Sequence, residues 1–208
     1  MTDNLYNSLN EIQIDALKEV TSIGAGNAAT ALSSLVGRKV QIQLPTVSIL
    51  DFNDALKLLG GPETIVNGIM IRLSGQIRGI MLYLQQLDFI NVILDGVLKE
   101  SVSDYSELTE IELSALTEVG NITMSSYLNA LSEMAGIEFS LSVPAVCVNM
   151  AGSLLSVPMA EYGYHTDKIM ILEGNFVCDN REVSSKLLLV PDIESLKFIL
   201  TRLGVAIE

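Results

Sequence analysis

The sequence predicts an α/β (α+β) fold: one pseudo-two-fold domain in which an antiparallel-rich sheet carries two exposed helices side by side. Three observations lead to this prediction. One helical pattern occurs twice at a constant offset, strand-like segments follow each copy, and apolar residues form 49% of the chain against 18% charged residues. A chain of 208 residues with this composition is long enough to bury one substantial core.

The helical pattern is an internal duplication. Glu19 and Pro45 recur as Glu118 and Pro144, both at an offset of 99 residues, so the two copies align without a gap. We therefore expect a single domain over residues 1–208, built from two repeats at approximately 11–99 and 108–208. Small and apolar residues recur at the same offset, among them Ala16, Leu17, Val20, Ile23, Ala31, Leu32 and Gly37.

The first repeat is expected to begin with a long helix. Asn10 suits the N-cap, an amphipathic pattern runs from Glu11 to about Val36, and Gly37 can end the helix. Residues 40–50 predict a strand, in which Pro45 requires an edge, a bulge or a break. The remaining elements are a short helix over 52–59, an antiparallel hairpin over 66–73 and 76–84, and an amphipathic helix over 87–98.

The second repeat is expected to follow a polar, acidic boundary at 99–107. Its long helix is predicted over 108–135 and ends at Gly136, and its first strand covers 137–150 with Pro144 inside it. Pro191 is expected to open a last helix over 192–203. The other predicted elements are strands over 152–159, 168–177 and 186–190, with a turn at 179–181.

One face of each long helix is polar. In the second copy Ser114, Glu118 and Asn121 fall in a narrow sector at about 100° per residue, opposite the apolar side of the helix. A carboxylate and a carboxamide are therefore expected side by side on the exposed face. The first copy has a hydroxyl where the second has the amide. Its corresponding residues are Asp15, Glu19 and Ser22.

The charge balance limits the classes of partner. Twelve basic and 25 acidic residues give a net charge of −13, which repels phosphate backbones and anionic lipid, so no nucleic-acid or membrane partner is expected. No apolar run approaches the roughly 20 residues that span a bilayer, and the N-terminus lacks the basic and apolar regions of a signal peptide. We expect a soluble, cytoplasmic protein.

Cysteine and histidine usage argues against metal and triad chemistry. Cys147 and Cys178 are widely spaced in apolar segments and are expected to be buried thiols, and His165 is the only histidine. A zinc site or a Ser-His-Asp triad would lack partners. We expect no metal and no cofactor of the chain's own. Three methionines are expected to fill the core, namely Met124, Met134 and Met150.

The segment Gly24-Ala-Gly-Asn matches the beginning of a dinucleotide-binding fingerprint. Such a loop follows a strand and is followed by an acidic residue about 20 positions later. Here the segment lies inside a predicted helix, and no acidic residue appears before Asp51. We interpret its small residues as allowing close packing or a kink.

The duplicated motif resembles that of the CheC family of bacterial and archaeal chemotaxis, which is related to CheX and FliY. The shared pattern is Asp or Ser, three residues, Glu, two residues, Asn, and 22 residues to Pro, and the similarity extends from Ile14 to Arg202. The resemblance implies a phosphatase (a hydrolase) acting on the aspartyl phosphate of the response regulator CheY, frequently in complex with the receptor deamidase CheD. The Mg²⁺ of the reaction is expected in the response regulator.

The resemblance also implies the roles of the motif residues. Glu118 and Asn121 of the second copy would be catalytic, with Glu19 as their counterpart in the first copy. Because Ser22 stands where the amide is expected, the first site is predicted to be weak or inactive. The positions expected to support the motif or contact the partner are Asp15, Ser22, Ser114, Pro45 and Pro144. Of these, Asp15 and Ser114 are interpreted as helix-start residues, and the prolines as shaping the chain after each helix.

Two other interpretations remain open. A CheC-like adaptor that holds CheD or phosphorylated CheY with little catalysis is favoured by Ser22 and opposed by Glu118 and Asn121. A flagellar switch component resembling FliY is opposed because the chain ends at Glu208 without a further domain. We expect a monomer, since the internal pseudo-symmetry already supplies a two-fold arrangement.

Overall fold

The computed structural model describes residues 9–43, 45–162, 168–178 and 181–205. Residues 179 and 180 of the expected turn, and His165, lie outside these ranges.

Two helices of equal length, α2 (Glu11–Val36) and α5 (Glu110–Ala135), confirm the two predicted long helices. Asn10 caps α2: its side chain accepts the Gln13 N–H at 3.0 Å, and Gln13 Oε1 accepts the Asn10 N–H at 2.9 Å. Gly37 ends α2 with a left-handed φ of 66°. The ends of α5 repeat this arrangement, with a capping box between Thr109 and Glu112 and Gly136 at a φ of 61°.

The caps correct one expectation. Asp15 and Ser114 are the fifth residues of α2 and α5, so they do not start their helices. Asn10 and Thr109 hold the cap positions instead, because each is followed three residues later by a side chain that completes a capping box.

The strands and short helices occur in the same order after each long helix. After α2 come β1 (Val40–Ile42), β2 (Thr46–Asp51), α3 (Phe52–Leu58), β3 (Ile65–Gly75), β4 (Gly79–Gln85) and α4 (Leu87–Val97). The short helix η1 (Tyr105–Glu107) precedes α5, after which come β5 (Phe139–Leu141), β6 (Ala145–Met150), α6 (Ala151–Tyr162), β7 (Lys168–Cys178), β8 (Arg181–Pro191) and α7 (Ile193–Arg202). Pro45 and Pro144 each break a predicted single strand into two.

The strand predicted over 152–159 is wrong. These residues belong to α6, which follows β6 directly, as α3 follows β2. The run is apolar and lacks a clear period, and Pro158 inside it argues against a helix. The helix forms because Ala151, Leu155 and Pro158 bury one side of it. Pro191 is also displaced from its predicted role, since it ends β8 and Asp192 caps α7.

In the described part of the chain, the strands form one sheet in the order β1-β7-β8-β4-β3-β5. β2 also pairs with β7, and β6 with β3, so each outer position of the sheet holds two short strands. Each of these pairings is antiparallel, which confirms the antiparallel-rich sheet. The β4–β8 pair lies at the centre of the sheet. On one side of it follow β3 and then β5 and β6, and on the other side follow β7 and then β1 and β2, which are the equivalent strands of the other repeat.

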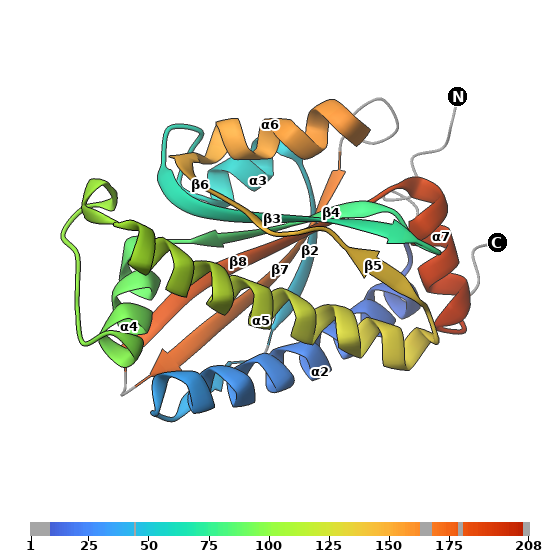
Figure 1. The fold of residues 1–208 in the computed structure, drawn as a ribbon. Helices are drawn as coiled ribbons and strands as arrows, with labels where there is room; N and C mark the ends of the chain where they lie inside the picture. Colours follow the sequence, from blue (N-terminus) through green and yellow to red (C-terminus); the bar gives the residue numbers. More distant parts are fainter. Residues whose placement is uncertain (1–8, 44, 163–167, 179–180, 206–208) are drawn as a thin grey trace.

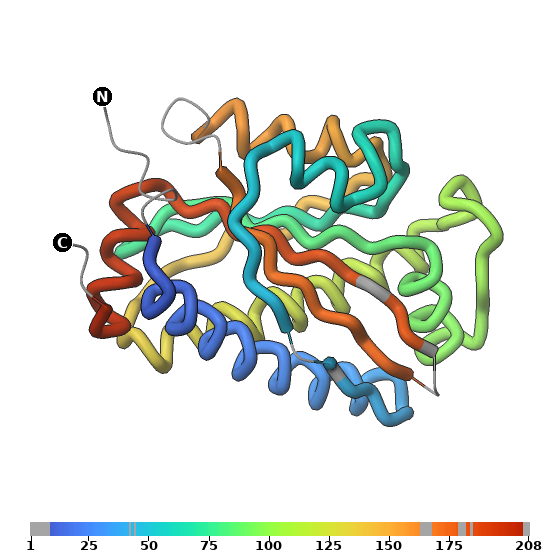
Figure 2. The backbone as a smooth tube through the Cα atoms, turned by 180° about the vertical axis from the view of Figure 1, so that it is seen from behind, coloured from blue at the N-terminus to red at the C-terminus, as the bar shows by residue number. Residues whose placement is uncertain are grey.

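Helices cover both faces of this sheet (Figure 1). The long helices α2 and α5 lie side by side against one face, with α4 and α7 at their two ends, and α3 and α6 lie on the other face (Figures 1 and 2). The larger core fills the space beneath α2 and α5, and a smaller one lies under α3 and α6. None of the helices in the described ranges has the length and apolarity to span a bilayer.

Two residues expected in the core are exposed. Cys147 and Met150 lie on β6, an outer strand of the sheet, whereas Cys178 and Met124 are buried and Met134 is half-buried. The apolar sequence of β6 predicts burial, but its position at the sheet edge leaves most of its side chains exposed.

Candidate functional site

The motif helices α2 and α5 run antiparallel to each other (Figure 1). They approach closely at Gly24, where an added Cβ would lie only 2.7 Å from the Tyr127 Cα. This contact confirms the interpretation of the small residues around Gly24 as a close-packing device. It also explains why no nucleotide loop forms there, because the segment is continuous helix between two packed elements.

The motif of α5 lies on the outer face of the helix pair. Ser114 and Glu118 are exposed and Asn121 is half-buried, while Leu116 and Val119 are buried against the sheet. Among the described residues, neither Glu118 nor Asn121 has a side-chain hydrogen bond or ion pair. The structure thus places the carboxylate and the carboxamide one turn apart with their polar atoms available to a partner.

Gly120 brings this part of α5 close to the sheet. An added Cβ at this position would lie 2.4 Å from Ile69 Cδ1 of β3. Sequence reasoning missed this contact, although a glycine inside a helical pattern is a signal of close approach. The backbone that carries Glu118 and Asn121 therefore rests directly on a buried strand.

The motif of α2 is exposed as well but differs in its contacts. Glu19 and Ser22 are both exposed, and Asp15 forms an ion pair with Lys18 at 2.8 Å on the same helix. A surface pair of this kind contributes little to stability. The first motif thus offers a carboxylate without the amide and with a cation nearby.

The two motifs lie toward opposite ends of the helix pair. Gly24 of α2 and Tyr127 of α5 face each other where the helices are in contact. Glu19 precedes Gly24 by five positions, and Glu118 precedes Tyr127 by nine. Because the helices are antiparallel, a rise of about 1.5 Å per residue separates the two carboxylates by roughly 20 Å along the helix axes. The structure therefore forms two separate surfaces, one for each motif. Pro45 and Pro144 are half-buried and lie between the two short strands at each outer position of the sheet; their roles toward a partner stay predictions.

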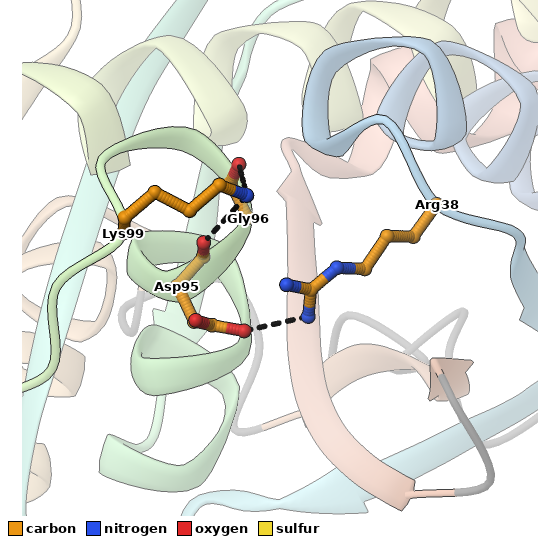
Figure 3. Close-up of polar contacts among 4 residues, drawn as sticks. All are labelled: Arg38, Asp95, Gly96 and Lys99. Atoms are coloured by element: carbon orange, nitrogen blue, oxygen red, sulfur yellow. Dashed lines mark hydrogen bonds and ion pairs between the residues drawn. The ribbon is translucent and has the colours of Figure 1, made fainter.

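Polar contacts secure the helix ends beside the second motif. Arg38, just after α2, donates to Asp95 Oδ2 of α4 at 2.6 Å, and Lys99 Nζ donates to the carbonyl oxygens of Asp95 and Gly96 at 3.3 and 3.2 Å (Figure 3). The lysine thus places a cation on the last carbonyls of α4. At the opposite end Arg202 of α7 donates to the carbonyls that end α5, at 2.9 and 2.8 Å. Both ends of the helix pair are therefore tied to neighbouring helices.

No group of three or more His, Cys, Asp or Glu residues in the described ranges is arranged to hold a metal ion. The side chains gathered at the second motif are a carboxylate, an amide and a hydroxyl, which can bind and orient a partner or a water molecule.

Comparison with known proteins shows where this arrangement belongs. A model of the CheC-like family matches the chain twice, over residues 12–49 and 111–148. Both copies of the motif therefore match the CheC-like family. Each matched segment runs from the first turn of a long helix into the strand after the proline, so both copies of the motif are included.

Curated relatives extend the similarity over nearly the whole chain. The CheY-P phosphatase CheC of Bacillus subtilis is 27% identical over 208 residues, covering 98% of this chain and 100% of that protein. The putative CheY-P phosphatase CheC1 of Halobacterium salinarum is 23% identical over 183 residues, or 88% and 92% of the two chains. The flagellar motor switch phosphatase FliY of B. subtilis is 30% identical over 142 residues, which cover 66% of this chain but 36% of FliY.

Solved structures share the fold. Thermotoga maritima FliY matches with a TM-score of 0.74 at 22% identity, covering 95% of this chain and 98% of that one. The FliM middle domain from H. pylori matches with a TM-score of 0.67 at 15% identity, covering 93% and 99%. At this level of identity the likeness is one of fold, so the function has to be argued from the motif residues.

Proposed function

We propose that the chain is a phosphatase that hydrolyses the aspartyl phosphate of CheY, with Glu118 and Asn121 of α5 presented to the response regulator. The observation that carries this proposal is the exposed carboxylate–carboxamide pair on a firmly seated helix. The two matches to the CheC-like family model, and the names of the curated relatives as CheY-P phosphatases, support the same activity.

The chemistry asks little of the phosphatase itself. An aspartyl phosphate is an activated acyl phosphate, so hydrolysis requires an in-line water and stabilisation of the charge on the phosphoryl oxygens. The Mg²⁺ that contributes to this stabilisation belongs to the response regulator. The phosphatase then needs neither a nucleophile nor a metal, which agrees with the residue types in the motif.

Asn121 is suited to place the attacking water. Its amide is neutral and offers both a donor and an acceptor, so it can accept a hydrogen bond from the water without repelling the phosphoryl group. An aspartate at this position would bring a negative charge against that group. Asn121 is therefore the positioning group for the water in the proposed reaction.

Glu118 is suited to bind the partner. It lies one helical turn from Asn121, is exposed, and makes no ion pair with a described residue. It can form a charge-assisted contact with a cationic group beside the phosphoaspartate, which holds α5 over the phosphoryl group. Glu19 can make a similar contact from α2, but Ser22 is too short to reach as an amide does.

The proposal is tested with purified protein and phosphorylated CheY. We expect phosphate loss to accelerate in proportion to the amount of protein, in the absence of CheD. Parallel reactions with CheD measure whether that protein activates this chain. No acceleration with or without CheD would contradict the phosphatase activity.

An adaptor that binds CheD is the second candidate, and the missing amide at Ser22 favours it because one of the two motif surfaces then lacks the positioning group. Co-elution of the chain with CheD, without any acceleration of phosphate loss, would support this alternative over catalysis.

Removal of the charge at position 118 should weaken partner binding more than chemistry. For Glu118→Gln we expect KM for phosphorylated CheY to rise about tenfold, since a charge-assisted hydrogen bond is replaced by a neutral one. Steady-state kinetics measure KM and kcat separately, with Glu19→Gln as the matched control and a smaller expected change. A large fall in kcat at unchanged KM would instead place Glu118 in the chemical step.

Introduction of an amide into the first motif should create activity there. In an Asn121→Ala background, Ser22→Asn is expected to raise the rate of phosphate loss about tenfold, a gain smaller than the loss that one positioning group causes. The background variant makes the second site nearly silent, so the gain reports on α2 alone. An unchanged rate would show that the α2 surface also has the wrong shape.

A further inference from the structure

A row of buried polar side chains lies on the sheet beneath α5. Asn67 of β3, Gln85 of β4 and Ser185 of β8 are neighbours across three adjacent strands, and all three are buried. Asn67 Nδ2 donates to Gln85 Oε1 at 2.7 Å, and Gln85 Nε2 donates to the Leu116 carbonyl oxygen at 3.4 Å. The row therefore reaches from the sheet to the backbone of α5.

The contacted carbonyl belongs to the turn that carries the second motif. Leu116 lies two positions before Glu118 and five before Asn121. Gly120, one turn after Leu116, allows α5 to approach the sheet because a larger side chain would collide with Ile69. The hydrogen bond from Gln85 thus connects the motif turn to the sheet, one turn before the close approach at Gly120.

The equivalent row beneath α2 is apolar. In the second-motif half of the sheet, Asn67 pairs with Val148 of β6. The residue equivalent to Val148 in the first repeat is Ile49 of β2, 99 positions earlier, and Ile49 pairs with Met170 of β7. Met170 is therefore the counterpart of Asn67. Met170 pairs in turn with Leu189 of β8, which is the counterpart of Gln85. Leu189 pairs with Met81 of β4, which is the counterpart of Ser185.

Among the described residues, no side chain of the sheet forms a hydrogen bond to the first motif turn. The Leu17 carbonyl, which corresponds to that of Leu116, accepts a hydrogen bond at 2.7 Å from the Thr21 hydroxyl of its own helix. Thr21 stands where α5 has Gly120. A cavity of about 30 Å³ remains at this place, lined by apolar residues that include Leu17, Met170 and Leu189.

Buried polar groups in and beside this row have no partner among the described residues. In the described part of the chain, Asn67 Oδ1 and the Tyr83 hydroxyl have no hydrogen-bond partner, and burial raises the pKa of the Tyr83 phenol. Ser185 and Thr123 lie near this hydroxyl but outside hydrogen-bond geometry. Buried polar groups without partners destabilise a protein. The apolar row under α2 occupies the equivalent place in the same sheet, so the polar row under α5 carries a cost in stability that its counterpart avoids.

We propose that Asn67 and Gln85 are positioning residues for the second motif: they anchor the Leu116 turn to the sheet so that Glu118 and Asn121 are held ready for the partner. This inference rests on the proposed phosphatase function. It gives a second reason for the predicted weak activity of the first motif, which lacks both the amide and, among the described residues, the anchor to the sheet.

The test replaces the row by apolar residues of similar size, in the variant Asn67→Leu/Gln85→Met. We expect kcat for phosphorylated CheY to fall about tenfold while KM stays within about twofold, since a displaced positioning group affects the chemical step. The midpoint of urea unfolding should stay the same or rise, because both hydrogen-bond partners are removed together. Amide hydrogen exchange at Gly120 and Asn121 should become about tenfold faster, as expected for a turn that opens locally.

The matched control is Met170→Leu/Leu189→Met beneath α2, for which we expect neither kcat nor exchange in α5 to change. Unchanged kcat and unchanged exchange in the polar-row variant would overturn the inference. So would a loss of activity that accompanies a lower unfolding midpoint and faster exchange along both helices, which is the result of a merely structural role. If the unaltered chain shows no phosphatase activity, the proposed function fails, and the exchange measurement still decides whether the row anchors the turn.

Discussion

The variant Asn121→Ala is expected to hydrolyse phosphorylated CheY more slowly by a factor on the order of 10² to 10³. The amide can orient water without carrying charge, and alanine leaves no polar group in its place. Stability should hardly change, because the side chain is half-buried and hydrogen-bonds to no described residue. Single-turnover phosphate release at saturating protein measures the chemical step directly.

Ser22→Ala is the matched control, since it removes the side chain at the corresponding position of α2. We expect its rate to stay close to that of the unaltered protein. Equal losses in the two variants would refute the asymmetry between the motifs. A further variant, Asn121→Asp, keeps the size of the side chain and should be as slow as the alanine variant, because the added charge opposes the phosphoryl group.

The second large effect concerns the packing of the two motif helices. Gly24→Ala is expected to lower the free energy of unfolding by about 1–3 kcal/mol, because the new methyl group would lie 2.7 Å from the Tyr127 Cα. The obstructing atom belongs to the backbone of α5, so no side-chain rotation can relieve the contact. Urea unfolding measures the change, with the slope checked for constancy.

Gly26 supplies the control from the same helix. It is exposed, and an added Cβ would meet nothing within 4 Å. Gly26→Ala should therefore raise the free energy of unfolding by up to about 1 kcal/mol, because alanine has the higher helix propensity. If both substitutions shifted the midpoint in the same direction, the close contact at Gly24 would not limit the distance between the helices.

Much of the local structure could be predicted because its signals are local. The capping residue Asn10 and the helix-ending Gly37 lie within a few residues of the groups that they satisfy. The polar face of α5 follows from helical periodicity, so the exposure of Glu118 could be predicted as well. The proline breaks in the outer strands follow from the missing N–H group of Pro45 and Pro144.

Other features depended on partners far along the chain. The helix α6 was missed because an apolar run without a clear period fits a strand or a buried helix equally well. Comparison of this run with Phe52–Leu58, which holds the equivalent place after β2, would have indicated a helix. The exposure of Cys147 was missed because its sequence does not show that β6 lies at the edge of the sheet.

By itself the sequence determined the two copies of the motif, the bounds of α2, the C-terminal end of α5, and the presence of the amide in the second copy alone. Only the tertiary structure decided that the copies lie at opposite ends of an antiparallel helix pair, and that a polar row supports one while an apolar row lies under the other. The physical reason is that caps and helical faces are set by neighbours within one or two turns. The contact between Gln85 and Leu116 depends instead on strand register and on how closely Gly120 lets α5 approach the sheet.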